Sequence, residues 1–238
     1  MADDIDVAAV AAWVDGRLLG LDGVVAVHRF QVGQSNPTFR LNTEAGSYVL
    51  RRKPGGVLLK SAHAVEREFA VQKALWGTSV PVPQMRLLCE DDSVIGAPFY
   101  LMDHVDGRSF DDPRLPDQTP QDRTAIIDSM NATLAAIHDV DLAAVGLSDY
   151  GPGGDYYARQ IGRWVKQYRA STTETIMAME DLIAWLEANT PADDGRRTLV
   201  HGDYRIDNLL FAKGSTDVVA VLDWELSTLG HPFADLAA

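Results

Sequence analysis

The chain has 238 residues, 46% of them hydrophobic and 23% charged, which is typical of a globular protein and excludes a disordered or collagen-like chain. Its longest apolar run covers residues 7–14, well short of the roughly 20 residues needed to cross a bilayer. The formal net charge of −13 argues against nucleic acid or an anionic membrane as a partner. A single cysteine, Cys89, and an acidic N-terminus unlike a signal or transit peptide predict a cytoplasmic location.

The first hundred residues predict a β-rich region with two helices. Apolar residues recur at helical spacing over residues 5–19, ending near Gly20, and again over residues 61–76, after which Pro81 and Pro83 prevent continuation. Turn residues separate the β-rich runs, which predicts antiparallel strands at residues 24–30, 38–43, 47–52, 85–89 and 98–102.

The remaining residues predict a helical region that ends in short strands. After an aperiodic stretch at residues 106–118, a helix begins with Thr119 as N-cap and Pro120 at its first position, and it runs to about His138. Its apolar face is expected to include Ile127, Met130, Leu134 and Ile137. Further helices are expected at residues 154–169 and 173–189, and strands at residues 198–200, 208–211 and 218–222. We therefore predict an α+β chain with a β-rich lobe at residues 1–102 and a helix-rich lobe at residues 103–238.

Negative charge is concentrated in the second half of the chain. Residues 1–101 carry ten Lys or Arg and eleven Asp or Glu, whereas residues 102–238 carry eleven and twenty-three. The excess is explained either by a solvated acidic surface or by a region that binds cations, such as metal ions or a basic substrate.

The strongest functional signal is the run His-Gly-Asp-Tyr-Arg-Ile-Asp-Asn at residues 201–208, which lies between two short apolar strands. Asp223 follows fifteen residues later, at the end of another strand. Phosphoryl transfer to a hydroxyl uses one Asp to orient and deprotonate that hydroxyl, and Asn and Asp oxygens to hold Mg²⁺. We interpret Asp203 as the base, and Asn208 and Asp223 as the metal ligands. The alternative is a metallohydrolase, with ligands drawn from His201, Asp203, Asp207, Asp223 and His231.

These residues, together with Leu-Asp-Trp-Glu at residues 222–225, resemble the motifs of the aminoglycoside phosphotransferase family. Residues 222–232 are most similar to the branch attached to acyl-CoA dehydrogenases. The resemblance covers about residue 24 to the end and implies a two-lobed protein-kinase-like fold, in which Asp235 braces the catalytic loop. It also implies a longer chain, so the C-terminal lobe is expected to be incomplete at Ala238. Protein kinases have Arg where this chain has Gly202, so no switching by a phosphorylated activation loop is expected.

The resemblance also assigns the phosphate-binding cation. The strand at residues 47–52 ends in basic residues, and the next helix carries acidic ones. The family pattern selects Arg51, in place of the usual Lys, and pairs it with Glu68. Arg binds phosphate and carboxylate with a planar fork. A basic strand end beside a solvated helix face is the alternative, and Arg52 and Lys53 are the other candidate cations.

Further residues of the nucleotide site are implied by their position in the family pattern. Ser35 and Asn36 lie in the first hairpin, where they would donate to phosphate or simply form a turn. In the connector at residues 98–107, backbone groups near Asp103 and Val105 would meet the adenine edge beside Met102, unless this is a plain buried edge strand. His138 is expected to be a packed structural residue. Four aromatic residues are expected mostly in the core, with some lining the acceptor pocket: Tyr156, Tyr157, Trp164 and Trp185.

Together these features predict an ATP- and Mg²⁺-dependent phosphotransferase that transfers the γ-phosphoryl group to a hydroxyl of a small molecule, with GTP as the alternative donor. The acidic second half suits an aminoglycoside acceptor, whereas the branch suggests a hydroxyacyl-CoA or another hydroxylated metabolite. The alternative from another class is a non-catalytic nucleotide-binding regulatory domain.

Overall fold

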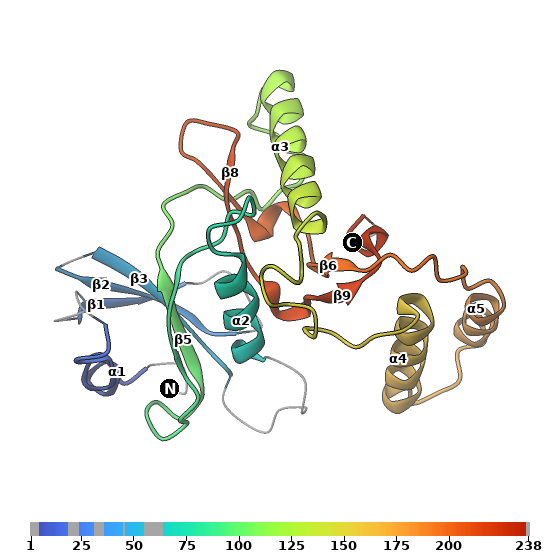
Figure 1. The fold of residues 1–238 in the computed structure, drawn as a ribbon, viewed down its shortest axis with the longest axis horizontal. Coiled ribbons are helices and arrows are strands. Elements are labelled where there is room, and N and C mark those ends of the chain that lie inside the picture. The colour runs from blue at the N-terminus through green and yellow to red at the C-terminus, as the bar shows by residue number, and fades with distance from the viewer. Residues whose placement is uncertain (1–4, 19–23, 31–35, 45, 55–63, 237–238) are drawn as a thin grey trace.

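The computed structural model describes all residues except 1–4, 19–23, 31–35, 45, 55–63 and 237–238. The N-terminal lobe is built on a five-stranded antiparallel sheet in the order β1-β2-β3-β5-β4 (Figure 1). Its strands are β1 (Val24–Arg29), β2 (Thr38–Thr43), β3 (Gly46–Arg52), β4 (Met85–Cys89) and β5 (Phe99–Asp103). Two helices accompany the sheet, α1 (Val7–Val14) and α2 (Val65–Leu75).

Alternation along the strands gives the sheet two apolar faces. Leu50 and Leu101, paired across β3 and β5, belong to a buried cluster with Val10 of α1. Val49 belongs instead to a cluster with Val65 of α2. In Figure 1, α1 and α2 lie on either side of β5. Because side chains two residues apart share a face, this alternation directs Arg51 toward α2.

The C-terminal lobe contains α3 (Pro120–His138), α4 (Tyr156–Ser171) and α5 (Met177–Ala188). Two antiparallel pairs complete it, β6 (Thr198–Val200) with β9 (Thr228–Gly230) and β7 (Leu209–Phe211) with β8 (Val218–Val221). Three short 3₁₀ turns are η1 (Ile206–Asn208), η2 (Trp224–Leu226) and η3 (Pro232–Ala234). No helix among the described residues is long and apolar enough to span a bilayer.

The main core joins the two lobes. Val71 and Leu75 of α2 pack in one cluster with Ile126 of α3 and with Leu209 and Val221 of the C-terminal strands. Helix α2 therefore buries one side against the sheet and the other against the C-terminal lobe. The boundary predicted after residue 102 falls within β5 and stays a prediction.

Two expectations about helices differ from the structure at particular residues. Helix α1 ends at Val14, earlier than the apolar spacing predicted, because Asp15 has a non-helical ψ of 128° and Gly16 has φ +69°. Leu18 still packs against the sheet cluster, so its apolar spacing reflects burial without a helix. In α3, Thr119 caps the helix by accepting from the Asp122 N–H, as predicted, but Ile127 is exposed and Ile126 is buried in its place.

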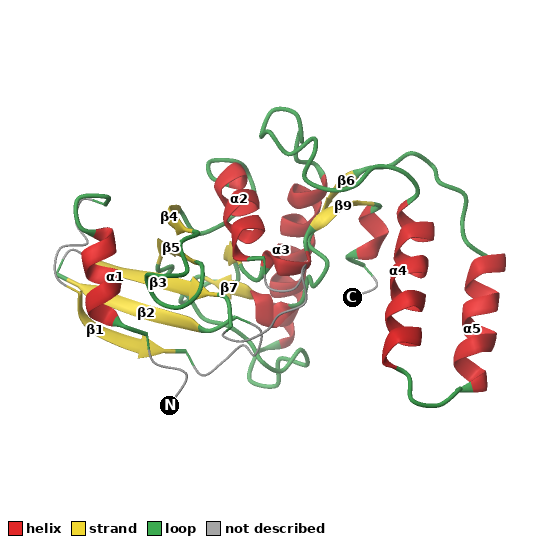
Figure 2. Cartoon of the chain, turned by 90° about the horizontal axis from the view of Figure 1, so that it is seen from below, coloured by secondary structure: helices red, strands yellow, loops and turns green. Residues whose placement is uncertain are grey.

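The expected core position of Trp164 and Trp185 is wrong. These side chains are 59% and 60% exposed. Helix α4 has no buried residue, and in α5 the one buried residue is Ile183. Figure 2 shows α4 and α5 side by side at one end of the molecule. Among the described residues, no further layer covers this helix pair, so large apolar residues such as Trp164 and Trp185 remain at the surface.

Candidate active site

Arg51 and Glu68 are in contact across the interface between β3 and α2. The Arg51 Nε lies 3.1 Å from Glu68 Oε2, and the Tyr100 hydroxyl donates to the same oxygen at 3.2 Å. Glu68 is fully buried. Burial raises the pKa of Glu68 to about 7, while the Arg51 charge acts in the opposite direction.

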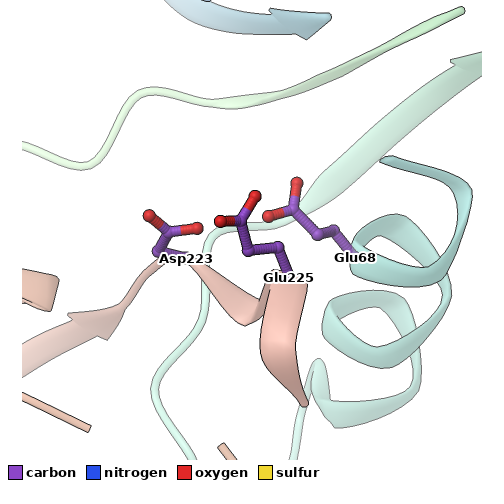
Figure 3. Close-up of side chains that lie close together, drawn as sticks. All are labelled: Glu68, Asp223 and Glu225. Carbon is purple, nitrogen blue, oxygen red and sulfur yellow. The ribbon is translucent and has the colours of Figure 1, made fainter. Parts of the chain in front are cut away.

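Arg51 also reaches the segment that follows β8. Its Nη2 lies 2.5 Å from Asp223 Oδ1 and 3.9 Å from Glu225 Oε2. Figure 3 shows the carboxylates of Glu68, Glu225 and Asp223 facing one space, and one oxygen from each lies within 4.8 Å of the others. Asp223 has left-handed backbone angles of φ 62° and ψ 57°, a conformation that Asp tolerates better than most residues.

Asp203 and Asn208 are joined by hydrogen bonds within the loop at residues 201–208. The Asn208 Nδ2 donates to the Asp203 carbonyl oxygen at 2.9 Å and to Asp203 Oδ2 at 3.0 Å. The Asn208 carbonyl oxygen accepts from the Leu222 N–H at 2.9 Å, which attaches this loop to the residue before Asp223. The Asp203 side chain is 35% exposed and therefore accessible to a substrate.

Asp235 binds the start of the loop at residues 201–208. Its buried carboxylate accepts from the N–H groups of His201 and Gly202 at 2.9 and 2.7 Å, and it lies 2.9 Å from His138 Nε2. These contacts are those of a brace, and they explain His138 as a packed residue. The His201 Nε2 in turn lies 2.9 Å from the carbonyl oxygen of Leu222, the residue that directly follows β8.

Gly202 occupies a position that excludes larger residues. Its φ is +85°, and a Cβ built there would lie 2.7 Å from the Leu226 carbonyl oxygen. Both the backbone angle and the space favour glycine. The Arg that protein kinases have at this position would therefore not fit against η2.

The two histidines that a metallohydrolase would use as ligands, His201 and His231, already have hydrogen-bond partners at their ring nitrogens. Both ring nitrogens of His201 have partners, the Leu222 carbonyl oxygen and the Asp203 N–H. Those of His231 lie 2.9 Å from the Tyr157 hydroxyl and 3.3 Å from Asp194 Oδ2. Among the described residues, the one cluster able to hold a metal consists of carboxylates. The geometry therefore does not support the metallohydrolase interpretation.

The connector between the lobes follows β5. The Asp103 carboxylate accepts two hydrogen bonds from the Arg86 guanidinium. The backbone N–H of Asp103 donates to the Gln84 carbonyl oxygen. The Val105 N–H has no acceptor among the residues that the structure describes. Met102 is buried in the cluster with Val49. These residues remain the predicted adenine-binding segment, with the Val105 amide as its donor.

Glu225 is the site residue that the sequence interpretation missed. The Asn36 Nδ2 donates to Glu225 Oε2 at 3.3 Å, and Asn36 is only 4% exposed. Asn36 thus faces the carboxylate cluster, and Ser35 lies outside the described residues. The available signal was the position of an acidic residue two places after Asp223, in Asp-Trp-Glu.

The sequence over residues 26–238 matches the phosphotransferase enzyme family, and the chain belongs to this family. It is 53% identical over 215 residues to acyl-CoA dehydrogenase family member 10 of Mus musculus, covering 90% of this chain and 20% of that protein. It is 44% identical over 236 residues to family member 11 of Homo sapiens, covering 98% of this chain and 30% of that protein. The chain thus spans a minor part of the length of these relatives.

Solved structures confirm the two-lobed protein-kinase-like fold. A Ralstonia eutropha protein named as an aminoglycoside phosphotransferase superposes with a TM-score of 0.86 at 50% identity, covering 98% of this chain and 68% of that one. A thermostable mutant of aminoglycoside phosphotransferase APH(4)-Ia, in complex with AMP-PNP and hygromycin B, superposes with a TM-score of 0.68 at 18% identity, covering 96% of this chain and 75% of that one. At that identity the second likeness concerns the fold alone.

Proposed function

We propose that this chain is an ATP- and Mg²⁺-dependent phosphotransferase that transfers the γ-phosphoryl group to a hydroxyl of a small molecule. The observation that carries the proposal is the position of Arg51 between Glu68 and Asp223. A permanent cation held beside acidic oxygen ligands is the arrangement that a metal–nucleotide complex requires. The AMP-PNP complex of the structural neighbour supports ATP as the donor.

The residues present fit a magnesium ion. Because Asn208 uses its Nδ2 to bind Asp203, its Oδ1 is the side-chain atom left for a cation. Asp223 adds a carboxylate, and hard oxygen ligands of this kind are those that Mg²⁺ prefers. Asn208 and Asp223 would hold the ion, which supplies charge neutralisation at the nucleotide phosphates.

Residues of the chain would bind the nucleotide phosphates and activate the acceptor hydroxyl. Arg51 stays charged at all relevant pH values and would bind the phosphates, while Glu68 holds its orientation. Asp203 would align the acceptor hydroxyl and take its proton. Its Oδ2 accepts from Asn208, which orients the carboxylate, and its Oδ1, which lies 4.0 Å from Arg205 Nη1, would accept from the hydroxyl.

The acceptor class follows from the relatives and is part of the proposal. The names of the curated relatives favour a hydroxyacyl-CoA or a similar hydroxylated metabolite. The hygromycin B complex of the structural neighbour makes an aminoglycoside the second class to test. A screen of both classes with radiolabelled ATP would identify the acceptor.

The test of the mechanism is Asp203→Asn, with Asp128→Asn on the exposed side of α3 as the matched control. General-base catalysis contributes about 10²–10⁴-fold, so kcat should fall by that factor while the dissociation constant of Mg·ATP changes less than about threefold. The control should match the wild type in both. A wild-type rate in Asp203→Asn would overturn the assignment. Tight Mg·ATP binding by the wild-type chain, without turnover of any acceptor, would favour a regulatory domain.

A further inference from the structure

Helix α2 is attached to the C-terminal lobe through Arg67, the residue that precedes Glu68. The Arg67 Nη1 donates to the Tyr150 carbonyl oxygen at 3.0 Å, and its Nη2 donates to the Ser227 carbonyl oxygen at 3.3 Å. The guanidinium also lies 4.3 Å from the centre of the Tyr150 ring, where a cation is attracted to the π-face. One side chain therefore joins α2 to two separate segments of the other lobe.

Those two segments are bonded to each other. The Tyr150 hydroxyl lies 2.7 Å from Ser227 Oγ, and the same Oγ donates to the Trp224 carbonyl oxygen at 2.5 Å. Ser227 is buried and follows Asp223 by four residues. We call Arg67, Tyr150 and Ser227 the α2 clamp. The α2 clamp holds the helix on the same short turn that carries Asp223.

The first turn of α2 has no side-chain cap among the residues that the structure describes, because its N-cap residue, Ala64, makes no side-chain hydrogen bond to the N–H groups that begin the helix. The same turn also carries an ion pair, in which Glu66 Oε2 lies 2.9 Å from Lys53 Nζ. Glu68 lies within this turn, and its carboxylate must stay within 3.1 Å of the Arg51 Nε. A displacement of the turn would separate the pair, so contacts that fix the turn also fix Arg51.

We propose that Arg67 is a positioning residue of the nucleotide site, which acts through the α2 clamp by keeping Glu68 against Arg51. Successive residues of a helix point about 100° apart, so Arg67 faces the C-terminal lobe while Glu68 faces β3. The Arg67 guanidinium donates to two carbonyl oxygens and is not expected to contact the nucleotide itself. Arg67 would therefore influence nucleotide binding through the position of Glu68. This inference rests on the proposed role of Arg51 as the phosphate cation.

The test compares Arg67→Ala with Lys73→Ala, which removes the same charge from an exposed position on the same helix. Dissociation constants of Mg·ATP and of adenosine are measured by calorimetry on the intact chain, with thermal unfolding as the check on folding. We expect Arg67→Ala to weaken Mg·ATP about tenfold and adenosine less than about twofold, because adenosine lacks the phosphates that Arg51 contacts. Lys73→Ala should stay within about twofold for both ligands.

Two further variants make the test specific to the α2 clamp. Arg67→Lys keeps the charge but not the two-pronged donor, so it should fold normally and show an intermediate loss of Mg·ATP affinity. In a Glu68→Gln background, Arg67→Ala should add less than about twofold, because residues that act through one another are not additive.

Each failure has its own signature. Absence of Mg·ATP binding in the wild type would overturn both the proposed function and the role of Arg67. Wild-type binding with unchanged affinity in Arg67→Ala would overturn the role of Arg67 alone. Equal weakening of Mg·ATP and adenosine, or full additivity with Glu68→Gln, would also overturn it, because Arg67 would then be a merely structural residue.

Discussion

Helix α2 and the helix pair α4–α5 differ in how many sides their neighbours cover. Helix α2 packs Val65 against the sheet and Leu75 into the core of the other lobe, and it also buries the ionisable side chain of Glu68. Helices α4 and α5 contact each other and leave large apolar residues at the surface, Trp164 among them (Figure 2). The comparison shows that helical periodicity defines an apolar face, whereas a neighbouring layer decides whether that face is buried.

The largest difference between the two regions should appear with the same substitution in each. Leu75→Ala in α2 removes a fully buried side chain and should lower the free energy of unfolding by ~2–5 kcal/mol. Leu182→Ala in α5 alters a side chain that is 46% exposed, so the free energy of unfolding should change by less than about 1 kcal/mol. Chemical denaturation of both variants measures the difference, and equal losses would show that α5 is buried in solution.

The next effect concerns two glycines. Gly202→Ala places a methyl group 2.7 Å from the Leu226 carbonyl oxygen at a positive φ, and should cost about 2–4 kcal/mol of stability. Gly153→Ala, at the approach to α4, meets no atom within 4 Å and should be within about 0.5 kcal/mol of the wild type. Urea titrations distinguish the two, and a neutral Gly202→Ala would contradict the close approach of η2.

A smaller effect is expected from the loss of one metal ligand. Asp223→Asn should weaken Mg·ATP binding on the order of tenfold and leave metal-free ATP much less affected, because it removes one charged oxygen ligand. The matched control is Asp181→Asn, an exposed position on α5. Calorimetry with and without Mg²⁺ provides the comparison. Equal weakening of both forms of ATP would remove Asp223 from the metal site.

The smallest effect concerns two helix caps. Thr119→Ala removes the side chain that caps α3 and should cost about 1 kcal/mol of global stability, because α3 packs into the main core. Asp155→Ala removes the corresponding cap of α4, which has no buried residue. Its effect should be confined to faster amide hydrogen exchange within α4. Global destabilisation by Asp155→Ala would show that α4 unfolds together with the core.

Features that depend on neighbours along the chain were predictable from the amino-acid sequence. The strand at residues 38–43, the cap at Thr119 and the occurrence of Asp203 and Asn208 in one loop follow from local spacing, turn residues and one compact motif. Alternation along β3 also indicated that Arg51 and Leu50 point to opposite faces. These properties are local because a strand's period and a cap's hydrogen bond involve residues only a few positions apart.

Contacts between residues that are distant along the chain become visible in the three-dimensional fold and were not predictable from the sequence. Glu225 joins the site because η2 passes beside β3, and Arg67 reaches Tyr150 and Ser227 across 83 and 160 residues of chain. The exposure of Trp164 was likewise not predictable from the sequence, because the apolar face of a helix does not reveal whether another element covers it. Contacts of this kind depend on how complete elements pack, and packing is set by long-range burial rather than by the period of any single segment.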